Sequence, residues 1–178
     1  MKPVELETQH LKLLPLSLSQ LQKYLQNNGS LETELGVYLA ERTISNELKE
    51  ALEKTIIPGV ADPKRNYLFT TLWTIVNKQG NRLVGDLCFY GEPDAEGSVE
   101  IGYGTYEAYR NQGIMTEAVA AMIEWAASFP GVTAIKASTD ADNPASWSVL
   151  LKNGFSKNGE SESILFWKRT LLRQPLQK

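Results

Sequence analysis

The stretch YRNQGIMTEAVAAMIEWA, residues 109–126, contains the change of pattern that decides the fold. It opens with polar residues, passes one glycine, Gly113, and continues with apolar residues at the three- and four-residue spacing of an amphipathic helix. The apolar positions of this pattern are Ile114, Ala118, Ala121, Met122, Trp125 and Phe129. The spacing predicts a helix over 112–129 that packs one face against a core and leaves its first turn free.

Gly113 has two interpretations. It can simply end a loop before a core-packing helix, and on this stretch alone that interpretation is favoured, because a single glycine is a weak signal. Alternatively, the backbone N–H groups around it and the helix N-terminus can hold a phosphate, since a missing Cβ lets a ligand approach the backbone closely. Arg110 would then add a cationic side chain at the rim.

The rest of the chain alternates between strand-like and helix-like patterns. Residues 67–78 are rich in aromatic and β-branched residues, residues 82–91 return after a short turn, and residues 98–106 give a third strand. The other expected elements are a strand at 10–16, a helix at 17–29, an interrupted helical segment at 31–56, a loop at 57–66, a strand at 133–139, a helix at 143–154 and a final hairpin at 155–171.

This order predicts an α/β (α+β) fold in which an antiparallel meander is followed by a strand–helix–strand unit. The sheet should be mixed but mostly antiparallel, with six to seven strands and helices on both faces. The unit 98–139 should form a right-handed crossover. The length favours a single domain over residues 1–178.

Composition excludes several classes of function. The formal net charge is −3 and no part of the chain is strongly basic, so nucleic acid is not the expected partner. The chain has one cysteine, Cys88, and one histidine, His10, so we expect neither an internal disulfide nor a metal-ligand cluster. No apolar stretch resembles a signal peptide or approaches the ~20 residues that span a membrane. The expectation is a cytoplasmic protein.

Other phosphate-binding motifs fit less well than the stretch around Gly113. A P-loop requires a Gly-Lys pair, and the chain has none. Gly102 and Gly104 offer the start of a dinucleotide fingerprint, but Glu107 stands where its third glycine would fall.

The stretch EIGYGTYEAYRNQGIMTEAV resembles the acyl-CoA motif of the GNAT superfamily of N-acetyltransferases. Of the pattern [RQ]-x-x-G-x-[GA], Arg110 and Gly113 match two of the three defined positions, and Met115 departs from the third. The stretch is most similar to the RimJ/RimL-like branch, which reads Y-R-G-x-G-Y-[AM]-T-E-A. Asn111 departs from the glycine common in that branch, although asparagine tolerates a left-handed backbone better than most residues.

The resemblance covers nearly the whole chain. Residues 6–25 are similar to the opening strand and helix of the branch, residues 82–91 to its third strand, and NPASWSVLLKNGF (143–155) to its N-x-x-S-x-x-V-x-x-x-x-G-F segment. Several motifs in the right order and spacing are more specific than any one of them.

The resemblance implies acetyl-CoA as co-substrate, with no metal. The pyrophosphate would lie on the amides of residues 110–115, and the pantetheine would pair like an extra strand between 98–106 and 133–139. The implied cofactor-binding residues are Ile101, Gly102, Tyr103, Arg110, Asn111, Gln112, Gly113, Ile114, Met115, Thr116 and Asn143. An amine would attack the thioester directly, and a backbone N–H of strand 98–106 would stabilise the tetrahedral oxyanion.

Two residues are candidates for catalysis. Glu100 is the leading candidate base, directly or through water, although a surface or cross-strand charge on an alternating strand is the favoured interpretation of this residue by itself; Asp86 on the neighbouring strand is expected to be structural. Many GNAT members protonate the leaving thiolate with a tyrosine, but Leu150 stands at that position. In the RimJ/RimL-like branch a serine at the place of Ser146 is thought to reach the sulfur instead. Ser146 can also merely cap the helix, as Asn143 can.

The sequence determines the acceptor less closely than the co-substrate. The resemblance implies a primary amine, either a protein N-terminal α-amine or a small molecule, and a homodimer as one state of assembly. The acceptor site would be shaped by residues 30–66 and the loop after 158, with Trp147 and Trp167 as candidates for lining it. The alternative is a non-catalytic acyl-CoA-binding or sensing module, which the missing tyrosine at Leu150 keeps open.

Overall fold

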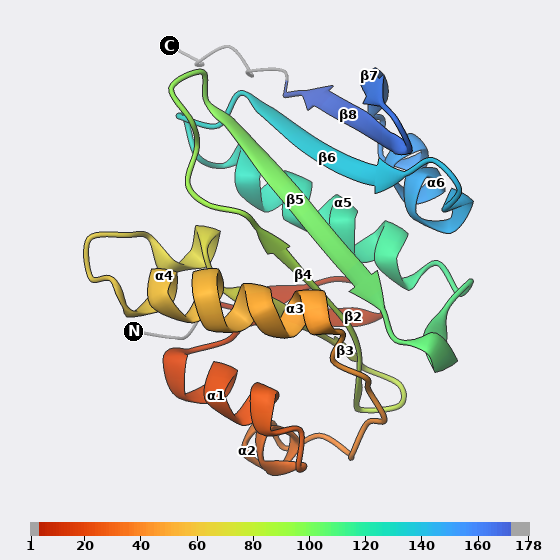
Figure 1. The fold of residues 1–178 in the computed structure, drawn as a ribbon. Helices are drawn as coiled ribbons and strands as arrows, with labels where there is room; N and C mark the ends of the chain where they lie inside the picture. The colour runs from red at the N-terminus through yellow and green to blue at the C-terminus, as the bar shows by residue number, and fades with distance from the viewer. Residues whose placement is uncertain (1–3, 172–178) are drawn as a thin grey trace.

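One eight-stranded sheet runs through the computed structural model, which describes residues 4–171 (Figure 1). The strand order is β1-β2-β3-β4-β5-β6-β8-β7, and every neighbouring pair is antiparallel except β5 and β6, which are parallel. The strands are β1 (Leu6–Glu7), β2 (Leu11–Pro15), β3 (Leu72–Asn77), β4 (Arg82–Phe89), β5 (Ser98–Thr105), β6 (Ala134–Asp140), β7 (Ser156–Ser161) and β8 (Ile164–Thr170). The mixed, mostly antiparallel sheet is confirmed. It has one strand more than the expected six to seven, because β1 is too short to show an alternating pattern.

Helices cover both faces of this sheet, as expected. The first face carries α1 (Leu18–Gln26), α2 (Ser30–Leu35), α3 (Asn46–Ala51), the π-helical turn η1 (Leu52–Ile56) and α4 (Ile57–Ala61), and the second carries α5 (Ile114–Ala127) and α6 (Pro144–Lys152) (Figure 1). Each face has its own buried cluster, the first built around residues such as Leu21 and Leu52 and the second around Met122 and Leu150. The sheet therefore separates two cores.

The ends of α1 follow from local chemistry. Ser17 accepts a hydrogen bond from the Gln20 N–H, and the Gln20 side chain accepts one from the Ser17 N–H, which together form a capping box. Asn27 ends the helix in the left-handed conformation that asparagine tolerates. The serine start and the Asn-Asn-Gly stop were both readable from the sequence.

The expectation of a loop at 57–66 is wrong for the first half of that segment. Residues 57–61 are helical and continue α3 through the π-helical turn η1. Pro58 lies inside this continuous helical segment, where it has no N–H to donate to the preceding turn. Gly59 is buried, and a Cβ there would lie 3.3 Å from the Cβ of Thr70, so the glycine permits close packing rather than a turn.

Two further boundaries differ from the sequence patterns. Residues 67–69 form a 3₁₀ turn, η2 (Tyr67–Phe69), and the strand expected from 67 begins only at Leu72. The aromatic residues there are misleading, because Phe69 packs against Trp125 with ring centroids 4.9 Å apart instead of extending the sheet. The interruption expected within 31–56 is the non-helical segment between α2 and α3, which begins at the left-handed Gly36.

The α5 helix packs on the second face of the sheet, but its buried face is rotated from the expected one. Its buried residues are Ile114, Met115, Ala118, Val119, Met122, Ile123 and Ala126. Ala121, Trp125 and Phe129 pack only partly against this core. The rotation buries the side chain of Met115. The side chains of the first turn therefore anchor the helix to the core, and only the backbone amide groups of that turn remain at the helix N-terminus.

Glu117 fixes the start of α5 to the N-terminal strands. Its Oε1 accepts from the Thr8 hydroxyl at 2.6 Å and from the His10 N–H at 2.9 Å, and its Oε2 lies 2.9 Å from His10 Nδ1. Burial raises the pKa of Glu117, but these hydrogen bonds outweigh it, and the net shift is below the ordinary value of 4.5. A carboxyl with a lowered pKa stabilises the fold above its unfolded-state pKa and stops doing so as pH falls through the folded-state pKa.

We therefore expect Glu117→Gln to lower the midpoint of urea unfolding at pH 7, and the difference from wild type to shrink as pH falls below about 4.5. Glu124→Gln is the matched control, because Glu124 is an exposed residue of the same helix. Equal midpoints for wild type and Glu117→Gln at pH 7 would contradict this assignment.

Candidate active site

A slot opens in the sheet where β5 and β6 separate. The two strands pair only through residues 98–100 and 134–136, and beyond Glu100 they diverge (Figure 1). The N–H of Tyr90 donates to the Glu100 carbonyl, so the backbone groups of the even-numbered β5 residues point toward β4. Because successive residues of a strand alternate, the peptide groups of Ile101 and Tyr103 point into the slot. An extended molecule in the slot would meet free donors and acceptors there.

The loop before α5 lies beyond the end of β5, after the 3₁₀ turn η3 (Glu107–Tyr109). Asn111 and Gly113 both have positive φ, 60° and 77°. The first helical hydrogen bond runs from the Glu117 N–H to the Gly113 carbonyl, and within residues 4–171 the N–H groups of residues 111–116 reach no acceptor. Six successive free amides around two left-handed residues at a helix N-terminus form a cradle for an anion.

Other features of this loop refine the expectations. A Cβ on Gly113 would meet no atom within 4 Å, so its cradle side is open. The side chains of Ile114 and Met115 are buried, which leaves only their amides for a ligand. The Arg110 Nε donates to the Thr105 carbonyl at 3.4 Å, and the Gln112 side chain donates to Ala108.

The first turn of α6 lies on the opposite side of the slot. Asn143 caps this helix, since its side chain accepts from the Ser146 N–H at 3.2 Å. The Tyr103 hydroxyl donates to the Ser146 carbonyl at 2.8 Å and so joins β5 to α6. Leu150 is fully buried, so α6 presents no phenol one turn later. Ser146 therefore carries a hydroxyl in the turn whose carbonyl is bonded to β5.

Glu100 lies on the other face of the sheet, at the point where the slot opens. The Ser138 hydroxyl on β6 donates to Glu100 Oε1 at 3.2 Å. Glu100 and Ser146 therefore stand on opposite faces of the slot, and each takes part in one of two hydrogen bonds across it. The fold brings both catalytic candidates beside the slot from sequence positions 46 residues apart, the difference between 146 and 100.

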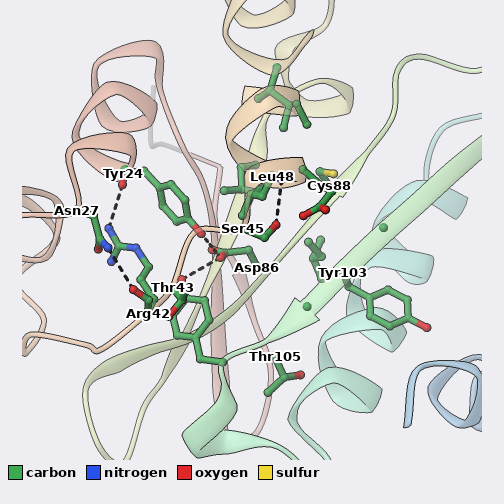
Figure 2. Close-up of a pocket in the computed structure, with 18 of the residues that line it drawn as sticks. Tyr24, Asn27, Arg42, Thr43, Ser45, Leu48, Asp86, Cys88, Tyr103 and Thr105 are labelled. Carbon is green, nitrogen blue, oxygen red and sulfur yellow. Dashed lines mark hydrogen bonds between the residues drawn. The ribbon is translucent and has the colours of Figure 1, made fainter. Parts of the chain in front are cut away.

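A cavity of about 1410 Å³ opens on the face of the sheet that carries Glu100, although Glu100 itself is not among its lining residues (Figure 2). Its floor is formed by β4 and β5 and its walls by the end of α1, the segment 39–45 and α3. A Cβ on Gly104 would meet no atom within 4 Å, whereas one on Gly102 would lie 2.1 Å from the Tyr90 hydroxyl oxygen. Gly102 therefore accommodates the Tyr90 ring, and Gly104 leaves the cavity open above the strand.

A buried polar cluster underlies this cavity and was not anticipated. Asp86 Oδ2 accepts from the hydroxyls of Tyr24 at 2.6 Å and Tyr106 at 2.9 Å. Burial raises the pKa of the Asp86 carboxyl, although the tyrosine hydrogen bonds oppose that shift. Asp86 thus ties α1 to β4 and to the residue after β5, which agrees with the structural role expected for it.

Arg42 extends this cluster into the cavity wall. Its buried guanidinium pairs with Glu32 and lies over the Tyr24 ring, 4.5 Å from the centroid. Its carbonyl accepts from the Asn27 side chain at 3.1 Å. These contacts hold the non-helical segment 39–45 against α1, as the labelled side chains in Figure 2 show. No local pattern in the sequence indicates them, because Arg42 and its partners lie on separate elements.

The tryptophans expected near the acceptor are placed elsewhere. Trp167 is 5% exposed in the core of the second face and donates to the Thr139 hydroxyl. Trp147 packs against that same core. Neither tryptophan lines the cavity, whose aromatic lining residues are Tyr24, Phe89, Tyr90, Tyr103 and Tyr106.

Residues 4–171 lack two further kinds of feature. Among residues 4–171, no three side chains of the His, Cys, Asp and Glu types gather so that they could hold a metal ion. No helix of the same residues is long and apolar enough to cross a bilayer.

Comparison with known proteins identifies the class to which this fold and slot belong. Residues 10–156 match the acetyltransferase (GNAT) domain family, which covers most of the chain. The chain therefore belongs to this family, whose members transfer the acetyl group of acetyl-CoA. The open amides of the loop before α5 fit the anionic pyrophosphate of that co-substrate.

The chain is similar to several individual proteins. It is 38% identical over 95 residues to the uncharacterized N-acetyltransferase YjdG of Bacillus subtilis (strain 168), a match that covers 53% of this chain and 56% of YjdG. The chain spans about half the length of the curated relatives it matches.

Solved structures with low identity share the fold. The ribosomal-protein-S5-alanine acetyltransferase of Vibrio fischeri has a TM-score of 0.66 at 18% identity, with 94% of this chain and 97% of that one covered. The ribosomal L7/L12 α-N-protein acetyltransferase RimL in complex with coenzyme A gives the same TM-score and identity, with 94% and 98% covered. These likenesses show that the chain shares the fold of these acetyltransferases.

Proposed function

We propose that this protein is an acetyl-CoA-dependent N-acetyltransferase that acetylates a primary amine by direct attack on the thioester. The observation that carries the proposal is the slot between β5 and β6, which leads from the free amides of residues 111–116 to a position between Glu100 and Ser146. The anion cradle would take the pyrophosphate, the slot would take the pantetheine, and the flanking side chains would lie beside the thioester. This is the order of these groups along acetyl-CoA.

The cofactor-binding role of each residue follows from its place along the slot. The amides from Asn111 to Thr116 would hold the pyrophosphate, with Arg110 at the rim. The peptide groups of Ile101 and Tyr103 would pair with the pantetheine amides, and Gly102 between them makes room for the Tyr90 ring on the cavity face. Asn143, the N-cap of α6, would hydrogen-bond a pantetheine amide.

The reaction needs one proton removed and one negative charge stabilised. Glu100 would take a proton from the acceptor ammonium, directly or through water, so that the nitrogen lone pair can attack the thioester carbonyl. The peptide N–H groups facing the slot would donate to the oxyanion of the tetrahedral intermediate. As the carbon–sulfur bond breaks, the electron pair stays on sulfur, and the Ser146 hydroxyl would donate a hydrogen bond to that thiolate.

The acceptor is either a protein N-terminal α-amine or a small-molecule amine. The fold neighbour RimL is an α-N-protein acetyltransferase of ribosomal L7/L12, which supports the protein amine. The cavity on the Glu100 face is the space in front of the thioester position and would receive either kind of amine.

Isothermal titration with acetyl-CoA, followed by a coenzyme A release assay across a panel of amines, tests the function. We expect binding and amine-dependent release of coenzyme A. Absence of binding at millimolar acetyl-CoA would refute the proposal. Binding without release for any amine would instead support the non-catalytic acyl-CoA-binding module.

Enlarging Gly104 tests where the acceptor binds. The series Gly104→Ala, Gly104→Val and Gly104→Leu should raise the acceptor KM stepwise, to roughly tenfold or more for leucine, because a Cβ there meets no atom within 4 Å and the added side chain would extend into the cavity. The dissociation constant of acetyl-CoA should stay within about twofold of wild type, which serves as the internal control. An unchanged acceptor KM across the series would place the acceptor elsewhere.

A further inference from the structure

Tyr103 crosses the slot on the face covered by α5 and α6. It belongs to the part of β5 that has already separated from β6, and its hydroxyl donates to the carbonyl of Ser146, the third residue of α6. In Figure 2 its ring points away from Asp86 and the cavity. The hydrogen bond thus joins β5, one of the two strands whose separation makes the slot, to the first turn of α6.

The carbonyl of Ser146 would have a hydrogen-bond donor even without Tyr103. A carbonyl in the first turn of a helix already accepts from the N–H four residues later. The phenol of Tyr103 is therefore a second donor, directed at the one turn of α6 that faces β5. Burial raises the pKa of Tyr103 to about 12, so its hydroxyl remains a donor at neutral pH.

The composition of α6 makes the placement of its first turn important. Leu150 is apolar and fully buried, so the helix offers no phenol to the leaving sulfur. Within residues 4–171 the Ser146 hydroxyl has no hydrogen-bond partner, which leaves it free to turn toward a ligand. A hydroxyl acts on a thiolate only if its position is held to within about 0.5 Å.

We propose that Tyr103 is a positioning residue: it holds the first turn of α6 against β5 so that the Ser146 hydroxyl faces the sulfur of acetyl-CoA. This inference rests on the proposed function. The carbon–nitrogen bond forms, the carbon–sulfur bond breaks with its electron pair on sulfur, and the amine proton leaves on the Glu100 side. Tyr103 exchanges no proton in this step and acts only through Ser146.

Three variants test the proposal: Tyr103→Phe, Ser146→Ala and the double variant. Because phenylalanine keeps the ring and removes only the hydroxyl, kcat should fall about tenfold in Tyr103→Phe while the dissociation constant of acetyl-CoA stays within about twofold of wild type. Ser146→Ala should show the same fall in kcat and the same nearly unchanged dissociation constant of acetyl-CoA. If Tyr103 works through Ser146, the double variant should have the kcat of Ser146→Ala alone, since removing the positioning hydroxyl costs nothing once its target is gone.

Several outcomes would overturn the inference. They are an unchanged kcat in Tyr103→Phe, losses that multiply in the double variant, or a loss seen only in acetyl-CoA affinity. Tyr109→Phe is the matched control, because Tyr109 also packs partly against the second core and its hydroxyl has no partner within residues 4–171. An inactive wild type would refute the proposed function itself, whereas an active wild type with multiplying losses would refute only the role of Tyr103. Thermal unfolding of each variant separates these results from loss of folding.

Discussion

Glu100→Gln should lower kcat by about 10²- to 10⁴-fold, the usual contribution of a general base. Glutamine has the shape of glutamate and can still accept the hydrogen bond from the Ser138 hydroxyl, but it cannot take a proton from the acceptor amine. The dissociation constant of acetyl-CoA should be unchanged, because Glu100 lies on the cavity face of the slot and away from the loop before α5.

The pH dependence makes this prediction more specific. Without the base, the enzyme depends on amine that is already deprotonated in solution, so kcat/KM of Glu100→Gln should rise about tenfold per pH unit below the acceptor pKa. The kcat/KM of the wild type should stop rising at a lower pH than that of the variant. Glu96→Gln is the control, since Glu96 is exposed in the turn before β5. A kcat within twofold of wild type for Glu100→Gln would show that another group or a water chain removes the proton.

Gly113→Val should weaken acetyl-CoA binding by about 10- to 100-fold. Gly113 has φ of 77°, and a side chain in this left-handed region costs roughly 1–2 kcal/mol. Its Cβ would also occupy the open space in front of the free amides, where the pyrophosphate is expected. Since about 1.4 kcal/mol is a factor of ten, the strain and the lost contacts together give this range.

Gly36→Val provides a matched control for Gly113. Gly36 has φ of 68° at the end of α2, and a Cβ there also meets no atom within 4 Å. Both variants carry similar backbone strain, but only Gly113 lies at the loop before α5. Titration calorimetry should show weaker acetyl-CoA binding for Gly113→Val and wild-type affinity for Gly36→Val. Equal affinities for the two variants would exclude the anion cradle.

The features that the sequence predicted well are local ones. Asparagine at position 111 was compatible with a left-handed backbone, and the structure gives it φ of 60°. Asn143 was expected to cap a helix, and it does. Each of these outcomes depends on one residue and its nearest neighbours, so a single sequence contains the necessary information.

The features that the sequence missed depend on residues far apart in the chain. The hydrogen bonds of Asp86 to Tyr24 and Tyr106 join three separate elements, and Arg42 secures a wall of the cavity through its contacts with α1 and α2. Pairing between distant side chains produces no periodicity in either segment. The helical segment 57–61 was missed for a related reason, because Gly59 serves a contact with Thr70 rather than a turn.

By itself, the sequence determined the type of each major element, the order of strands and helices, and the loop that carries the free amides, because periodicity, capping residues and left-handed positions are properties of short segments. Only the tertiary structure decided where β5 and β6 separate, which side chains bridge the slot, and where the cavity lies. Those features arise from how strands diverge and helices pack, and they bring Glu100, Tyr103 and Ser146 together across the fold.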